Sequence, residues 1–183
     1  MGPDWDVLIL LTMILVFAIC FIPTASSDTD RYVANFYASY ARLSCQPSHL
    51  TLFSRTPADL RTYLLEKDVI FDGGGNTRSM LAAWRDWELD AILRKAWQAG
   101  VVLAGISAGA ICWYDQGETD SVQVPLLSLA CLGFLPGSCC PHYDGESDRR
   151  SSYHSLLSDA EISLGIALDD CAAAHYEAPC GSM

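Results

Sequence analysis

Residues 101–113 read Val-Val-Leu-Ala-Gly-Ile-Ser-Ala-Gly-Ala-Ile-Cys-Trp, and this stretch decides the fold. Its first six residues predict a buried strand, and a Gly-x-Ser-x-Gly pattern at 105–109 leads from that strand into a short helical stretch. Such a tight turn holds its serine in a strained, exposed position, and the helix N-terminus offers free N–H groups to a developing oxyanion. The pattern therefore indicates that Ser107 is a nucleophile. The alternative is a glycine-rich turn in which Ser107 only caps the helix.

A second glycine-rich turn lies upstream, where residues 73–77 read Gly-Gly-Gly-Asn-Thr after the short apolar strand 69–71. Glycine lets backbone N–H groups approach a ligand closely, which suits the other half of an oxyanion hole. No Gly-Lys-Ser/Thr follows and no Gly-x-Gly-x-x-Gly is present, so nucleotide binding is disfavoured. Asn76 is a candidate for substrate binding in this turn. Alternatively, it caps the helix that follows.

Predicted strands and helices alternate along the chain. The helical patterns cover residues 30–43, 57–65, 77–99 and 148–157, and the apolar strand patterns cover 16–22, 49–53, 69–71, 101–106 and 165–168. Alternation of this kind is typical of a parallel sheet covered on both faces by helices. We therefore expect an α/β fold with a doubly wound, mostly parallel sheet. Neither a repeat nor a linker interrupts it, so residues 1–183 are expected to form one domain.

The composition supports a compact core and an acidic surface. The 183 residues are 51% hydrophobic, and 11 Lys plus Arg stand against 22 Asp plus Glu, for a net charge of -11. A chain of this length suits one domain. Its charge repels phosphate backbones, which disfavours nucleic-acid binding. Acidic small molecules are repelled as well, unless a local cation reverses the field.

The eight cysteines do not form a recognisable metal or redox motif. No Cys-x-x-Cys pair occurs, which disfavours zinc ribbons and thioredoxin-like sites. A set made of Cys139, Cys140, His142 and Asp144 fits no common zinc spacing. We therefore expect no metal and no organic cofactor, and free thiols in a reduced, cytoplasmic protein.

The apolar run at residues 7–22, from Val7 to Ile22, raises the question of a membrane segment. The run is shorter than the ~20 residues of a spanning helix, and two aspartates precede it where a signal peptide carries positive charge. We therefore expect a buried helix followed by a buried strand at 16–22, in a cytoplasmic protein. Membrane anchoring or secretion through Val7–Ile22 is the alternative.

A serine nucleophile needs a base, and the chain has four histidines: His49, His142, His154 and His175. His142 is the best candidate, because it lies in the segment Pro-His-Tyr-Asp at 141–144 after a long apolar stretch. His49 begins a short upstream strand, and His154 lies on a predicted surface helix.

The third member of a triad is a carboxylate that orients the imidazole ring. Asp169 and Asp170 follow the strand at 165–168, so in a parallel sheet they lie at the same edge as the two glycine-rich turns. Asp144 is a rival, although its position two residues from His142 constrains its reach.

Taken together, these segments resemble the peptidase E family, the S51 serine peptidases. The resemblance rests on residues 68–77 and 105–110, with segments 21–26, 140–144 and 168–170 in the same order, and it covers about residues 19–177. The family's fold is similar to that of class I glutamine amidotransferases, a flavodoxin-like three-layer fold, with serine in place of the cysteine nucleophile. The order Ser107, His142, Asp170 also differs from the α/β-hydrolase order of serine, acid, histidine.

The resemblance implies a role for individual residues. Ser107 matches the family nucleophile, His142 its general base and Asp170 its acidic third member, with Asp169 one residue away. The backbone amides expected to form the oxyanion hole are those of Gly74, Gly75 and Ala108.

The resemblance also suggests a substrate, because the family is known for dipeptidases that prefer an N-terminal aspartate. An acidic substrate requires a cation in an acidic protein, and Arg149 or Arg150 could supply it. The alternative for both arginines is a solvated helix start.

The sequence thus predicts a cytoplasmic serine peptidase that cleaves dipeptides or short peptides through an acyl-enzyme. The alternative is a catalytically inactive, amidotransferase-like binding or assembly module. Asp72 favours this alternative, since it places a carboxylate beside the oxyanion loop, and so do chain ends that differ from the family pattern. Exposed sheet edges would favour a homodimer.

Overall fold

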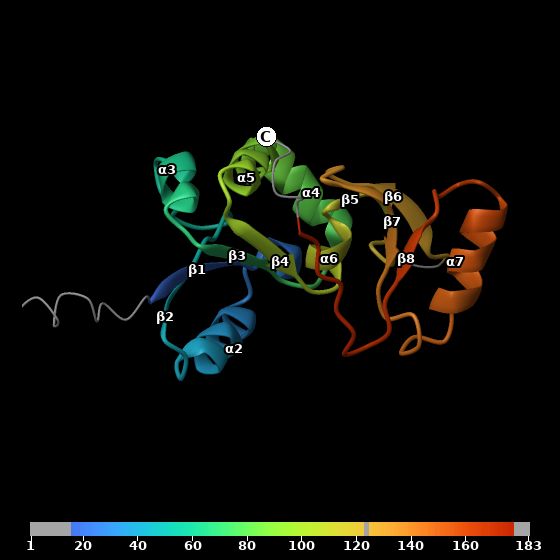
Figure 1. The fold of residues 1–183 in the computed structure, drawn as a ribbon, viewed down its shortest axis with the longest axis horizontal. Helices are drawn as coiled ribbons and strands as arrows, with labels where there is room; N and C mark the ends of the chain where they lie inside the picture. The colour runs from blue at the N-terminus through green and yellow to red at the C-terminus, as the bar shows by residue number, and fades with distance from the viewer. Residues whose placement is uncertain (1–15, 123–124, 178–183) are drawn as a thin grey trace, which may run out of the picture.

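A computed structural model describes residues 16–122 and 125–177. Its strands form two four-stranded, hydrogen-bonded sheets that lie side by side (Figure 1). None of the helices among these residues is long and apolar enough to cross a membrane. The predicted strand at 16–22 is confirmed as β1 (Phe17–Ile22), whereas the helix expected before it lies outside the described residues.

The first sheet is entirely parallel. Its strands are β1, β2 (Cys45–His49), β3 (Val69–Asp72) and β4 (Val102–Gly105), in the order β2-β1-β3-β4. This order reverses direction between β1 and β3, and in doubly wound sheets ligands bind at the carboxyl ends of strands around such a point. The two glycine-rich turns follow β3 and β4 and therefore lie at this edge.

Helices cover both faces of the first sheet because side chains along β1 alternate between them. Ile19 and Phe21 pack against Phe36 of α2 (Asp30–Tyr40), on the lower face in Figure 1. Cys20 and Ile22 face the other way, into the main core. The helices that close this core are α3 (Leu60–Leu65), α4 (Thr77–Asp86) and α5 (Leu89–Gln98).

The second sheet is mixed and has the order β6-β5-β7-β8. Its strands are β5 (Tyr114–Thr119), β6 (Leu127–Ala130), β7 (Leu135–Cys140) and β8 (Gly165–Ala167). Only β6 runs antiparallel to its neighbour. Helix α7 (Arg149–Ser158) covers its outer side, and the short α6 (Ala108–Ile111) contacts strands of both sheets.

The predicted mostly parallel α/β architecture with helices on both faces is confirmed. One continuous sheet was expected, whereas the hydrogen bonds between strands define two sheets. Helix α6 lies at their junction, where it contacts β3 and β4 of the first sheet and β5 and β7 of the second. The predicted helix at 77–99 divides near Asp86, as expected, where Glu88 has a left-handed backbone.

Two expected boundaries were wrong. The strand expected at 49–53 ends at His49, because Leu50 and Leu52 are buried from a loop rather than from a strand. The helix expected from residue 57 begins at Leu60, since the Asp59 carboxylate accepts the Thr62 N–H and caps it there.

Candidate active site

The turn that carries Ser107 connects β4 to α6, and its backbone explains the two glycines. Ser107 has φ 54° and ψ -115°, a strained conformation for a residue with a side chain. A Cβ on Gly105 would overlap the carbonyl group of Gly109, and a Cβ on Gly109 would overlap Asp72. Glycine is therefore required on both sides of the serine, so that β4, α6 and β3 can approach closely.

The loop after β3 lies directly beside the serine. A Cβ on Gly74 would lie 3.3 Å from the Ser107 Cβ and 3.8 Å from its Oγ. Gly75 has φ 139° and packs against the Ala25 carbonyl, which only glycine permits. Within the part of the chain that the structure describes, no hydrogen bond occupies the amide groups of Gly74, Gly75 or Ala108. These N–H groups are therefore available to an oxyanion.

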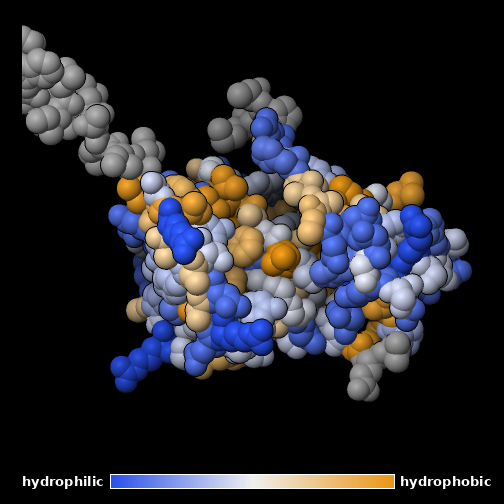
Figure 2. All heavy atoms as spheres, turned by 90° about the horizontal axis from the view of Figure 1, so that it is seen from below, coloured by the Kyte–Doolittle hydropathy of each residue, from blue (hydrophilic) through white to orange (hydrophobic). Residues whose placement is uncertain are grey.

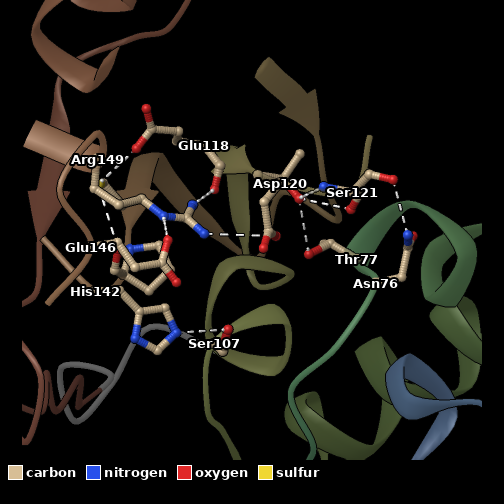
Figure 3. A network of polar contacts seen from close by, with 12 residues as sticks. Asn76, Thr77, Ser107, Glu118, Asp120, Ser121, His142, Glu146 and Arg149 are labelled. Atoms are coloured by element: carbon tan, nitrogen blue, oxygen red, sulfur yellow. Dashed lines mark hydrogen bonds and ion pairs between the residues drawn. The ribbon is translucent and has the colours of Figure 1, made fainter. Parts of the chain in front are cut away.

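His142 meets Ser107 from the second sheet. It follows β7 and Pro141, and its Nε2 lies 3.0 Å from the Ser107 Oγ (Figure 3). Its backbone also has a positive φ, 55°. The imidazole can accept the serine proton at Nε2 when its other nitrogen carries a proton.

Asp170 supplies the partner of that other nitrogen. Its Oδ1 lies 2.7 Å from the His142 Nδ1. The segment after β8 is brought here by further backbone pairing, because Leu168 donates to the Cys140 carbonyl and accepts from the Tyr143 N–H. Asp144 does not compete for the imidazole; its Oδ1 instead accepts the Asp170 backbone N–H at 2.7 Å.

The three substrate-binding candidates, Asn76, Arg149 and Arg150, differ in their exposure and in the partners that their side chains already have. Both ends of the Asn76 amide are engaged, since Oδ1 caps α4 at the Ser79 N–H and Nδ2 donates to the Ser121 carbonyl. Arg149 is 2% exposed and contacts carboxylates. Arg150 is exposed, and its guanidinium lies 4.8 Å from the centre of the Tyr143 ring.

Asp72, singled out in the sequence, is fully buried at the end of β3. Neither carboxyl oxygen has a hydrogen-bond partner among the described residues. Burial raises the pKa of this carboxyl well above its usual value, so the neutral acid is the form that the fold holds.

Several polar contacts near the site were not predicted from the sequence. Glu118 is fully buried at the end of β5 and accepts from the Cys140 thiol at 3.0 Å. Glu146 lies 2.6 Å from the Arg149 Nε. Asp120 pairs with Arg149 at 3.6 Å. Their elements carried no clear apolar period, and only the unusual density of acidic residues around His142 could have drawn attention to them.

Exposed carboxylates lie near the site, among them those of Asp120, Asp144, Glu146 and Asp170. In the view from below, hydrophilic side chains cover most of the face, and apolar ones gather in smaller groups (Figure 2). Among the described residues, no group of three or more His, Cys, Asp or Glu side chains is arranged to hold a metal ion. The seven described cysteines carry free thiols.

Comparison with known sequences assigns the chain to a family. Residues 11–178 match the model of peptidase family S51. The chain is 56% identical over 158 residues to the uncharacterized peptidase YgaJ of Bacillus subtilis, covering 86% of this chain and 68% of that protein. It is 29% identical over 128 residues to peptidase E of Streptomyces coelicolor, covering 68% of this chain and 51% of that protein.

Solved structures agree on the fold. A crystal structure of a protein assigned as peptidase E from Listeria monocytogenes matches with a TM-score of 0.62 at 21% identity, over 84% of this chain and 80% of that one. A peptidase from an acI-B1 actinobacterium matches with a TM-score of 0.57 at 18% identity, over 74% and 61% of the two chains.

Proposed function

Because the chain belongs to peptidase family S51 and is therefore a serine peptidase, we propose that it hydrolyses dipeptides or short peptides with Ser107, His142 and Asp170 as its catalytic triad. One observation carries this proposal. Asp170, His142 and Ser107 form a continuous hydrogen-bonded series, with distances of 2.7 and 3.0 Å, although they come from three separate segments of the chain.

In the proposed mechanism, His142 Nε2 takes the proton of the Ser107 hydroxyl as Oγ attacks the scissile carbonyl carbon. Asp170 accepts from Nδ1–H throughout and stabilises the imidazolium that forms. The same imidazolium then protonates the leaving amine, and the acyl-enzyme remains on Ser107. A water molecule that gives its proton to His142 attacks this ester, releases the acid product and restores the serine.

The oxyanion of each tetrahedral intermediate would be held by backbone amides. The two amides of the loop after β3, at Gly74 and Gly75, and the Ala108 amide at the start of α6 are the proposed donors. Preorganised donors of this kind contribute because they are aimed at charge that develops only in the transition state. Their lack of partners within the described residues supports this role.

A preference for an N-terminal aspartate is the finer part of the proposal. Arg150 is the candidate for the substrate carboxylate, since its guanidinium is exposed. The Arg149 guanidinium is already compensated by Glu146 and Asp120, and the Asn76 amide is engaged at both ends. We also propose a cytoplasmic protein whose chain forms one domain.

The test is hydrolysis of an Asp-Xaa dipeptide panel, with matched Leu-Xaa and Arg-Xaa dipeptides. Ser107→Ala and His142→Ala are each expected to remove nearly all turnover without loss of fold, and Asp170→Asn to lower kcat by about 10²- to 10⁴-fold. Asp169→Asn is the matched control and is expected to stay close to wild type. Cleavage limited to Asp-Xaa would support the substrate preference, and equal cleavage of Leu-Xaa would remove it.

The inactive binding module makes the opposite prediction. Folded protein without serine-dependent cleavage of any dipeptide would support that alternative and contradict the proposed triad. The hydrogen-bonded series argues against it, because a relic site has no need for three aligned side chains from two sheets.

A further inference from the structure

Arg149 is a buried cation beside the proposed triad. It lies in the first turn of α7, and its side chain is 2% exposed. Its Nε donates to Glu146 at 2.6 Å, one terminal nitrogen donates to the Glu118 carbonyl at 3.2 Å, and the other lies 3.6 Å from Asp120 (Figure 3). Removing a guanidinium from water costs several kcal/mol unless such partners compensate it.

These partners belong to two different segments. Glu118 and Asp120 lie at the carboxyl end of β5. Glu146 lies in the loop that carries His142, and the Gly145 and Glu146 amides both donate to the His142 carbonyl. Arg149 therefore joins the end of β5 to the loop that holds the proposed general base.

The end of β5 is in turn tied to the first sheet. The Ser121 carbonyl accepts from Asn76, its hydroxyl accepts from the Arg78 N–H, and Thr119 contacts Thr77 at 3.4 Å. Residues 118–121 thus connect the glycine-rich loop after β3 with the loop that carries His142. This connection matters because Ser107 follows a strand of one sheet, whereas His142 and Asp170 follow strands of the other.

The backbone of His142 needs such support. Its φ of 55° is unusual for a residue with a side chain, and a conformation of this kind is strained. They persist only where the surrounding structure determines them. A loop released from Arg149 can relax toward ordinary backbone angles and move Nε2 away from Ser107.

We propose that Arg149 is a positioning residue, whose buried guanidinium fixes the His142 loop against the end of β5 and so keeps the imidazole on Ser107. The inference rests on the proposed triad. It assigns Arg149 a role other than capture of an acidic substrate, because its charge is already shared with two carboxylates.

The rate at which an uncharged alkyl fluorophosphonate labels Ser107 tests this proposal, because the reagent carries no carboxylate to be captured. Peptide mass spectrometry would give the labelled residue and the rate. Arg149→Met is expected to slow labelling by about 10- to 100-fold, since displacements near 1 Å can cost 10²-fold. Arg149→Lys, which keeps the charge, is expected to restore part of the rate. Arg94→Met is the control, because Arg94 is half-buried and its guanidinium, like that of Arg149, donates to backbone carbonyls, here those of Leu132 and Gly133.

Hydrogen–deuterium exchange supplies a second readout. Arg149→Met is expected to raise exchange within residues 142–148 and not in β1 or β3. Wild-type labelling rates in folded Arg149→Met would overturn the proposal, and so would a rise only in KM for acidic dipeptides, which would indicate substrate binding.

Failure of the proposed triad can be distinguished from failure of the proposed role of Arg149. If wild-type Ser107 is not labelled, or labels equally in His142→Ala, the proposed function fails first. If Arg149→Met does not fold, the labelling rate of Glu146→Ala is measured instead, because this variant also breaks the Arg149–Glu146 pair. The Glu146 side chain is 47% exposed, so its removal leaves no cavity in the core. Slower labelling of that variant supports the proposal, and an unchanged rate overturns it.

Discussion

Asp72 is an unusual residue of this fold, because its carboxyl group lies in the apolar core. Its carboxyl is fully buried at the end of β3, beside the turn that carries Ser107, and it lacks a hydrogen-bond partner among the described residues. Desolvation raises the pKa of this group well above its usual value. The folded protein therefore holds a proton here that the unfolded chain loses above pH about 4. Stability must then fall as pH rises above that value.

Asp72→Val is expected to raise the free energy of unfolding by about 1–3 kcal/mol at neutral pH, since an unpartnered polar group leaves the core. The advantage over wild type should grow with pH from 5 to 8. Urea unfolding at several pH values measures both effects. Thr24→Val is the control: the Thr24 hydroxyl is also buried without a partner in the described part of the chain but does not titrate, so the effect of this substitution should not depend on pH. A pH-independent gain for Asp72→Val would show that the buried group does not hold a proton.

The sequence predicted Ser107 and His142 as a nucleophile and base because each lies in a short, distinctive segment, and the structure brings the two side chains within hydrogen-bonding distance. Asp169 and Asp170 could not be separated in this way, since both follow the same strand. The choice depends on backbone pairing of Leu168 with Cys140 and Tyr143, which brings Asp170 to the imidazole. The support from Asp144 and Arg149 was not predictable, because it comes from contacts between segments distant in sequence.

At the scale of elements, the turn between β4 and α6 requires glycine at positions 105 and 109. Gly105→Ala is expected to lower the free energy of unfolding by about 3 kcal/mol or more, because its Cβ would overlap the Gly109 backbone and cannot be relieved by a rotamer change. Gly100→Ala is the matched control. Gly100 has φ 95° and no atom within 4 Å of an added Cβ, so only backbone strain of about 1 kcal/mol is expected. Urea unfolding measures the free energy of unfolding of both variants. Equal losses of stability would contradict the explanation that the Gly105 Cβ overlaps the Gly109 backbone.

Elements of the first sheet were easier to predict than those of the second. Strands β1, β3 and β4 are short, largely apolar runs that end at a glycine or directly before a glycine or proline, which is a strong local signal. Strands β5 and β7 contain Asp115, Gln116, Glu118 and Gly137, which interrupt the apolar pattern, and the partners of their polar groups come from distant segments. The Gly137 N–H, for example, donates to Asp115, which no local pattern reveals.

At the scale of the whole molecule, the net charge of -11 opposes the approach of acidic substrates. Raising the salt concentration from about 20 mM to about 500 mM should therefore raise kcat/KM for an Asp-Xaa dipeptide by about two- to fivefold relative to a Leu-Xaa dipeptide. Steady-state assays of the two dipeptides in parallel give this ratio and cancel general salt effects. A ratio that falls with salt would mean that a local cation dominates the field at the site.

The two sheets are each built from a continuous stretch of chain, residues 17–105 and residues 114–167. A ribosome delivers the first stretch before the second, and folding units formed early in synthesis can assemble while the rest emerges. The proposed triad is divided between the two stretches, so a nascent chain that has folded only the first sheet carries Ser107 without its proposed base and acid. Serine-dependent hydrolysis by the proposed triad therefore requires both stretches to be folded and packed against each other.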